Sequence, residues 1–314
     1  MGDEQKVEER LKNLMKNKDD LRRVVRRDLR SVEQGKRAKQ FFDQLYGLNY
    51  TEEQLAEKPF LNVGPGSFHH KYWTTVDKFY GGDVSWSMNR RGVEQKPVDY
   101  QWDFYERSPL PFEDNSIRLV YCSHVIEHGF NNDVEFLFSE LYRVLKPGGV
   151  LRVVCPDAAL LADAYYMSDW PYFMHYLSVK TNRRRPDVSD FQRLEESGFF
   201  AEFVLEWVSL LAHSKNPFVV KRDDAKEFLA RFETLRDGFN AAQALSSREL
   251  NRRVGGHVNW FDEEKLFRFL KRAGFQNLVR SRYLQSQSPL MRDAQLFDRT
   301  DPEMSLFVEA VKAS

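Results

Sequence analysis

Two histidines and a glutamate stand close together in the stretch SHVIEHGF, residues 123–130. His124, Glu127 and His128 have the spacing i, i+3 and i+4, which would place all three side chains on one face of a helix. An imidazole titrates near neutral pH and can take a proton from a hydroxyl group. Imidazole together with carboxylate also binds zinc, iron or manganese. The stretch therefore predicts either a general base, with His128 ahead of His124, or a metal site.

A second candidate site is the Gly64-Pro65-Gly66 turn, which follows the apolar stretch FLNV. Glycine lets the backbone approach a ligand where a Cβ would clash. Asp77 ends the next apolar stretch, where an acid can accept hydrogen bonds from ribose hydroxyls. The separation of 77 − 64 = 13 positions is shorter than the roughly 20 of dinucleotide folds. The pattern favours a nucleotide-binding turn with an abbreviated first helix, and an ordinary turn is the alternative.

The elements that must position these residues alternate between strand and helix, which indicates a doubly wound, mostly parallel α/β sheet. Ligands of such sheets bind at the carboxyl ends of the strands, where His124, Glu127 and His128 are expected. We expect strands at 60–63, 74–77, 97–103, 117–122, 150–155 and 304–312, and helices at 133–145 and 262–275.

Two segments lie outside this alternation. Residues 1–48 are charge-dense and nearly free of glycine and proline, which predicts a helical arm that packs on the body or on a second subunit, as in a homo-oligomer. The arginines at 22, 23, 26, 27 and 30 favour a solvated face, with an anionic partner or membrane surface as the alternative. Residues 158–255 are predicted to be a helical substrate-binding insertion into a domain spanning 49–314, with most of its aromatic residues in a core.

Composition excludes some classes of function. Lys plus Arg and Asp plus Glu both number 47, so the formal net charge is zero and no basic footprint for nucleic acid is present. Cys122 and Cys155 fall in apolar runs and are expected in the core. No signal-peptide pattern and no apolar run of the roughly 18 residues needed to span a bilayer is seen. We therefore expect a soluble, cytoplasmic protein that acts on a small molecule or glycan.

The stretch LPFEDNSIRLVYCSHVIEHGFNNDVEFLFSELYRVLKPGGVLRVVCPD, residues 110–157, resembles the class I S-adenosylmethionine-dependent methyltransferases of the small-molecule branch. The tail is similar too, with HVNWFDEEKLFRFLKRAGF followed by SLFVEAVK. The resemblance covers roughly residues 59–157 and 256–312. It implies a Rossmann-like fold whose last strand is antiparallel, with S-adenosyl-L-methionine as cofactor.

The resemblance also implies the cofactor-binding residues, which are Asn62, Gly64, Pro65, Gly66, Asp77, Asp103, Phe104 and Ser123. In the family the glycine turn holds the methionine end, the acid after the second strand holds the ribose, and the acid after the third strand meets the adenine. Asn62 departs from the family pattern, which usually has an acid there. The Pro156-Asp157 pair resembles a subgroup of predicted methyltransferases linked to glycan biosynthesis.

The catalytic residues expected from this resemblance are His128, His124, Glu127 and His257. Methyl transfer needs the acceptor held in line with the sulfonium methyl, and a hydroxyl acceptor must also lose a proton. Small-RNA 2′-O-methyltransferases have a similar Glu-x-x-Glu-His motif that chelates a divalent ion together with a distant histidine. Here His124 replaces the first glutamate, so a metal held by His124, Glu127, His128 and His257 is the alternative to a metal-free base.

These observations predict an S-adenosylmethionine-dependent O-methyltransferase acting on a sugar or glycan hydroxyl, as in polysaccharide biosynthesis. Two alternatives stand beside it. One is a methyltransferase of another small hydroxylated or amine natural product. The other is a non-catalytic scaffold that uses the fold to bind a partner.

Overall fold

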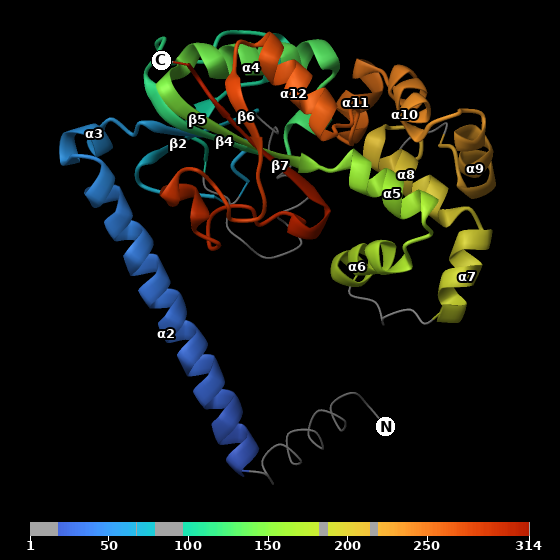
Figure 1. Ribbon diagram of the computed structural model, residues 1–314, viewed down its shortest axis with the longest axis horizontal. Helices are drawn as coiled ribbons and strands as arrows, with labels where there is room; N and C mark the ends of the chain where they lie inside the picture. The colour runs from blue at the N-terminus through green and yellow to red at the C-terminus, as the bar shows by residue number, and fades with distance from the viewer. Residues whose placement is uncertain (1–17, 67, 79–96, 182–187, 214–218, 314) are drawn as a thin grey trace.

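The computed structural model describes residues 18–66, 68–78, 97–181, 188–213 and 219–313. Its centre is a seven-stranded sheet in the order β3-β2-β1-β4-β5-β7-β6 (Figure 1). β7 runs antiparallel to both of its neighbours, whereas the other strand pairs are parallel. The strands are β1 Phe60–Val63, β2 Trp73–Asp77, β3 Tyr100–Gln101, β4 Ile117–Ser123, β5 Leu145–Pro156, β6 Gln276–Arg280 and β7 Ser305–Val311. This is the predicted methyltransferase-like fold class, and the prediction is confirmed.

Helices surround the sheet and form the two additional segments. They are α2 Lys18–Asn49, α3 Glu52–Ala56, α4 Asn131–Val144, α5 Ala158–Tyr166, α6 Trp170–Thr181, α7 Val188–Glu196, α8 Phe199–Val208, α9 Arg222–Ala230, α10 Leu235–Ala244, α11 Arg248–Val254 and α12 Glu263–Arg272, with 3-10 turns η2 Phe104–Glu106, η3 Ile126–His128, η4 Pro289–Arg292 and η5 Pro302–Met304.

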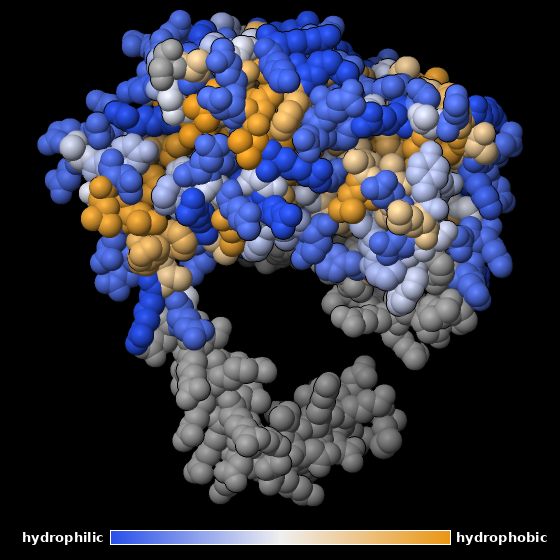
Figure 2. All heavy atoms as spheres, viewed as in Figure 1, coloured by the Kyte–Doolittle hydropathy of each residue, from blue (hydrophilic) through white to orange (hydrophobic). Residues whose placement is uncertain are grey.

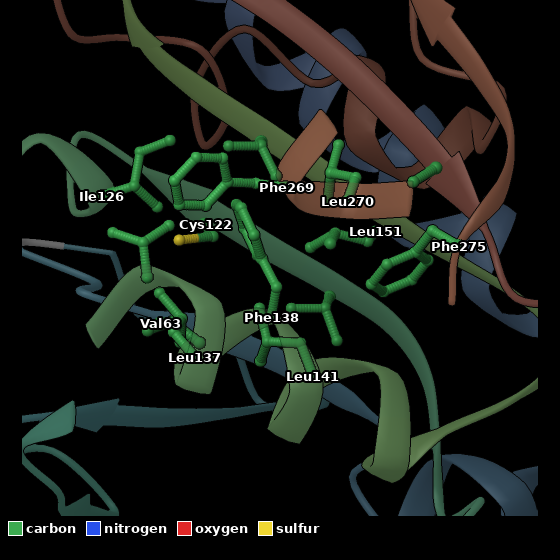
Figure 3. Close-up of a cluster of buried hydrophobic side chains, with 14 of the residues drawn as sticks. Val63, Cys122, Ile126, Leu137, Phe138, Leu141, Leu151, Phe269, Leu270 and Phe275 are labelled. Atoms are coloured by element: carbon green, nitrogen blue, oxygen red, sulfur yellow. The ribbon is translucent and has the colours of Figure 1, made fainter. Parts of the chain in front are cut away.

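One face of the sheet packs against α4 and α12 (Figure 3). Leu137, Phe138 and Leu141 recur at helical spacing on α4, so their side chains share one face and meet the sheet. Phe269 and Leu270 of α12 pack into the same cluster. Cys122 and Cys155 are buried free thiols in this core, as expected.

The opposite face is covered in an unusual way near β1 and β2. The described residues between these strands, 64–66 and 68–72, contain no helix, so the abbreviated helix predicted there is wrong. Tyr46 from the end of α2 and Phe297 from the C-terminal segment pack there instead, against Trp73. The Trp73 indole N–H donates to the Tyr46 hydroxyl over 2.7 Å. Residues distant in the chain therefore replace the missing crossover helix.

The segment from α5 to α11 forms a second hydrophobic core beside the sheet (Figure 1). Phe173, Phe200, Phe203 and Trp207 are all buried in it, so these aromatic side chains pack in a core, as expected. Asp157 begins α5 by accepting hydrogen bonds from the Ala159 and Leu160 backbone N–H groups over 3.1 and 3.2 Å.

The long helix α2 runs away from the body in Figure 1. Near the body, Gln295 Nε2 donates to the Gly35 carbonyl over 3.0 Å. Figure 2 shows apolar surface where α2 meets the body, and Phe41 and Leu48 are exposed on this part of the helix. The arginine face predicted at positions 22–30 lies outside the residues whose side chains are described. Among the described residues, no helix combines the length and apolar character that a membrane crossing requires.

Three expectations about the strands need correction, two of their boundaries and one strand that was missed. The strand predicted at 97–103 is only Tyr100–Gln101, because Asp99 bonds Thr75 and Asp103 caps η2. β5 begins at Leu145 rather than at residue 150, directly after α4. β6 was not predicted, since its central residue is only half-buried and the rest are exposed, which hides the usual alternation.

Candidate active site

The turn after β1 is shaped by Gly64, whose φ of 67° lies in the left-handed region. A Cβ at this position would lie 2.3 Å from Val125 Cγ2, so only glycine fits without displacement. The Gly64 N–H donates to the Val76 carbonyl over 2.9 Å, and Phe68 N–H closes the turn on the Pro65 carbonyl over 2.8 Å. The turn after β1 and the segment after β4 are therefore in direct contact.

Two polar groups near this turn, one buried and one half-buried, can accept further hydrogen bonds. Asn62 is 1% exposed and its Oδ1 has no hydrogen-bond partner among the described residues. Asp77 ends β2 and, among the described residues, accepts a local bond from the Lys78 N–H over 2.7 Å. Burial is the main reason that the pKa of Asp77 rises to about 6, and the nearby Asp103 raises it further. A carboxyl of this kind gains from hydrogen-bond donors supplied by a ligand.

The predicted adenine-side residues have structural roles as well. Asp103 accepts a hydrogen bond from Tyr105 N–H over 2.9 Å and thereby caps η2. Phe104 packs close to Gly129, where a Cβ would lie 2.5 Å from its ring. Ser123 is the last residue of β4 and is half-buried. The structure places these residues after β3 and at the end of β4, two strands of the same sheet that β2 and β1 separate.

The segment after β4 is not the helix that the spacing predicted. His124 has a φ of 54°, and only Ile126–His128 forms a 3-10 turn. The prediction that His124, Glu127 and His128 share one helical face is therefore wrong. The backbone of His124 lies in the left-handed region and turns the chain before a helix can begin. His124 and Glu127 still meet, since His124 Nδ1 lies 3.2 Å from Glu127 Oε1. One ligand atom of His128 also lies within 4.8 Å of one of Glu127.

His128 meets His257, which approaches from the loop after α11. Their ring centroids are 5.0 Å apart. His128 Nδ1 donates to the Gly256 carbonyl over 3.0 Å, and His257 Nδ1 donates to the Trp207 carbonyl over 2.9 Å. A carbonyl can only accept, so both Nδ1 atoms carry the proton and each neutral ring presents its Nε2 lone pair. The four catalytic candidates are thus brought together.

Glu127 is 1% exposed, and neither of its carboxylate oxygens accepts a well-aligned hydrogen bond from the described residues. Burial by itself raises the pKa of Glu127, but the three imidazoles, His124 foremost, outweigh it and lower the pKa to about 2. Burial and the neighbouring His128 lower the pKa of His257 to about 4. These four residues, His124, Glu127, His128 and His257, are called the cluster below. At neutral pH the cluster therefore contains a carboxylate beside a neutral His257 imidazole.

The loop that carries His257 is bonded to the backbone of η3. The Glu127 carbonyl accepts from the Val258 and Asn259 N–H groups over 2.8 and 3.1 Å. The Asn251 side chain donates to the His128 carbonyl over 3.2 Å. The hydroxyl of Tyr105 also donates to this carbonyl. Sequence reasoning missed Tyr105, Asn251 and Asn259, because no motif separates them from ordinary loop residues.

The comparisons with known proteins find methyltransferases. Residues 61–153 match the family model described as "Methyltransferase domain". Sterol 24-C-methyltransferase erg6 of Schizosaccharomyces pombe is 38% identical over 64 residues, 20% of this chain and 16% of that protein. The ubiquinone/menaquinone biosynthesis C-methyltransferase UbiE of Desulfotalea psychrophila is 34% identical over 80 residues, 24% of this chain and 30% of that protein. The chain spans less than a third of either relative.

Solved methyltransferase structures match this chain with low TM-scores. Human N-acetylserotonin methyltransferase in complex with SAM has a TM-score of 0.34 and 12% identity, over 89% of this chain and 57% of that chain. A SAM-dependent methyltransferase of Methanosarcina mazei has a TM-score of 0.36 and 14% identity, over 81% and 92%. Both TM-scores lie below 0.5, so these structures carry no argument about function.

The matched segment and the strand order support the class of S-adenosylmethionine-dependent methyltransferases, with S-adenosylmethionine as cofactor. The residues present fit that cofactor. The partnerless Asn62 Oδ1 can accept from its amino group, and Asp77 can accept from its ribose hydroxyls. The close approach at Gly64 leaves backbone, rather than side chain, beside the methionine end.

Proposed function

We propose that this protein transfers a methyl group from S-adenosylmethionine to a hydroxyl oxygen of a sugar or glycan. The observation that carries the proposal is the contact between Gly64 and Val125. It joins the turn that would hold the cofactor to the segment that bears Glu127 and His128. A methyl donor on one side of this contact thus faces proton-accepting groups on the other.

The residues divide into two roles in this reaction. Asn62, Gly64 and Asp77 bind and orient the cofactor, which supplies an electrophilic methyl group on a sulfonium sulfur. Glu127, His128 and His257 lie together in the cluster, to which we assign the acceptor side, with His128 as the group that takes the acceptor's proton. The acceptor oxygen forms the new bond to the methyl carbon, and the C–S bond pair passes to sulfur. The products are the methyl ether, S-adenosylhomocysteine and a proton on the cluster.

A hydroxyl acceptor is favoured by the composition of the cluster. An alcohol is a weak nucleophile at neutral pH, so it gains from a nearby group that removes its proton. The cluster offers a charged carboxylate and free Nε2 lone pairs in one buried place. The helices from α5 to α11 close this side of the site, and Trp207 contacts His257 with ring centroids 5.5 Å apart. The contact between Trp207 and His257 supports the proposal that the insertion forms the acceptor pocket.

A carbon acceptor is the second candidate, because both curated relatives are named C-methyltransferases. Their matches cover only 20% and 24% of this chain. An activated carbon acid also has to lose a proton, and the same cluster would serve. The two candidates differ in which atom is methylated.

The experiment is a methyl-transfer assay with S-adenosylmethionine labelled in the methyl group. The acceptor panel contains nucleotide sugars and oligosaccharides, with a sterol and a quinone precursor as carbon acceptors. We expect label in a sugar fraction as an alkali-stable methyl ether, and S-adenosylhomocysteine in equal amount. Label on a ring carbon of the quinone precursor would favour the second candidate. Cofactor binding without turnover of any acceptor would support the non-catalytic scaffold.

A further inference from the structure

Glu127, His128 and His257 have the donor set of a metal centre. One ligand atom from each residue lies within 4.8 Å of the others. Two imidazoles and one carboxylate suit zinc, iron or manganese better than magnesium. Three protein ligands also leave an open coordination position, as catalytic metal sites require. We propose that these three residues bind one divalent transition-metal ion, an inference that rests on the proposed function.

Both imidazoles are already oriented for a metal. The Nδ1 atoms of His128 and His257 donate to the backbone carbonyls of Gly256 and Trp207. This arrangement fixes the tautomer and leaves Nε2 free, which is how metal-binding histidines are usually held. The two histidines that make this kind of hydrogen bond are 129 positions apart in the chain (257 − 128 = 129). A histidine that served only as packing would not need a fixed Nε2 lone pair.

The carboxylate provides the second, independent observation. Glu127 is 1% exposed and its oxygens have no well-aligned hydrogen-bond donor among the described residues. A buried carboxylate without donors is costly unless a cation compensates it. A cavity of about 10 Å³, lined in part by Glu127, Trp207 and Asn259, adjoins it. A bound ion would supply the missing positive charge directly beside this carboxylate.

His124 supports the site without joining it. Its Nδ1 faces Glu127 Oε1 at 3.2 Å, and its Nε2 lies 3.0 Å from Ser305 Oγ. Both ring nitrogens are therefore engaged, and His124 acts as a positioning residue for the carboxylate. This revises the four-residue ligand set considered from the sequence to three residues. Metal–ligand bonds of about 2.0–2.2 Å would draw the three groups closer together than they are now.

The role of the ion follows from its place beside the transferred methyl group. A divalent ion lowers the pKa of an oxygen ligand, so a bound acceptor hydroxyl loses its proton more readily at neutral pH. The proton would leave to solvent or to a neighbouring base, and the oxygen lone pair would form the bond to the methyl carbon as the C–S bond breaks and its electron pair passes to sulfur. The ion is not oxidised or reduced, and no further reactant is needed.

The first test measures metal in the full chain, purified without a histidine tag and dialysed against Zn²⁺, Mn²⁺ or Fe²⁺. Elemental analysis should find about one ion per chain. Co²⁺ should give the visible absorption bands of a low-coordinate site. Glu127→Gln and His257→Ala should each lower metal affinity at least ~10-fold. The matched control is His175→Ala, which should bind metal like the wild type. His175 is an exposed histidine on α6 that lies beside Glu303.

Each outcome decides the proposal. Equal metal content in the wild type, Glu127→Gln and His257→Ala would overturn it, and so would no metal in a chain that binds S-adenosylhomocysteine. Calorimetry with S-adenosylhomocysteine on every variant confirms that it is folded. EDTA should abolish methyl transfer, and added ion should restore it. Full activity after complete metal removal would overturn the catalytic role. A wild type that binds no S-adenosylhomocysteine would overturn the proposed function instead, whatever its metal content.

Discussion

Asp77 at the end of β2 and Glu127 after β4 are both largely buried at the same edge of the sheet, yet their pKa values shift in opposite directions. Burial, together with the nearby acid Asp103, raises the pKa of Asp77 to about 6. Glu127 is surrounded by three imidazoles, and its pKa falls to about 2. The first environment favours neutral hydrogen-bond donors such as ribose hydroxyls. The environment of Glu127 keeps the carboxylate negatively charged, which favours a bound cation or the transfer of a proton.

The largest expected effect tests the Glu127 side of this comparison. Glu127→Gln preserves shape but removes the charge, so turnover should fall by roughly 10²–10⁴. Affinity for S-adenosylhomocysteine should stay nearly unchanged, because Glu127 is not among the residues proposed to hold the cofactor. Steady-state kinetics together with calorimetry checks both statements. Turnover within threefold of the wild type would mean that Glu127 has no part in the chemistry.

The contact that joins the two sides can be broken at Gly64. Gly64→Ala adds a Cβ 2.3 Å from Val125 Cγ2 at a φ of 67°, which should destabilise the protein by roughly 2–4 kcal/mol. Gly148→Ala is the matched control, since its φ is 74° but nothing lies within 4 Å of the added atom. It should cost only about 1–2 kcal/mol. If urea unfolding showed the same loss of unfolding free energy for Gly64→Ala and Gly148→Ala, the contact between Gly64 and Val125 would be loose.

The Asp77 side is tested by cofactor affinity. Asp77→Ala should weaken S-adenosylhomocysteine binding by roughly 1–3 kcal/mol, the scale of hydrogen bonds to a charged group. The ionised carboxylate accepts both ribose hydroxyls, so wild-type affinity should fall as the pH drops through about 6. The decline should approach about tenfold per pH unit. Calorimetry across this range should find Asp77→Ala nearly flat, and a parallel decline would assign the titration to another group.

The smallest effect concerns the stability of the protein without cofactor. A raised folded-state pKa means that Asp77 contributes stability below about pH 4, which is lost as the pH rises through about 6. Asp77→Asn should therefore stabilise the unliganded protein at pH 7 by roughly 1–3 kcal/mol. Asp99→Asn should act in the opposite direction, since bonds from Thr75 lower the pKa of Asp99 although burial opposes them. Stabilisation by both changes in thermal melts would contradict the comparison.

The sequence predicted the Asp77 side better than the Glu127 side, and distance along the chain explains the difference. Asn62, Gly64 and Asp77 stand at the ends of strands whose apolar runs are visible in the sequence. The absence of a helix between β1 and β2 could not be predicted, because the residues that take its place, Tyr46 and Phe297, come from distant parts of the chain. In the cluster, His124 takes a left-handed backbone that no residue spacing reveals. The pairing of His128 with His257 was proposed only from resemblance.

The hydrogen bonds from Val258 and Asn259 to the Glu127 carbonyl also have a consequence for folding. They join segments about 130 residues apart, so the chain must close a long loop before the cluster exists. A folding chain can build the turn after β1 from neighbouring strands while Glu127 still faces solvent. We therefore expect the cofactor half to gain protection from hydrogen exchange earlier than η3 during refolding. In that order of events, competence to bind the methyl donor precedes competence to use it.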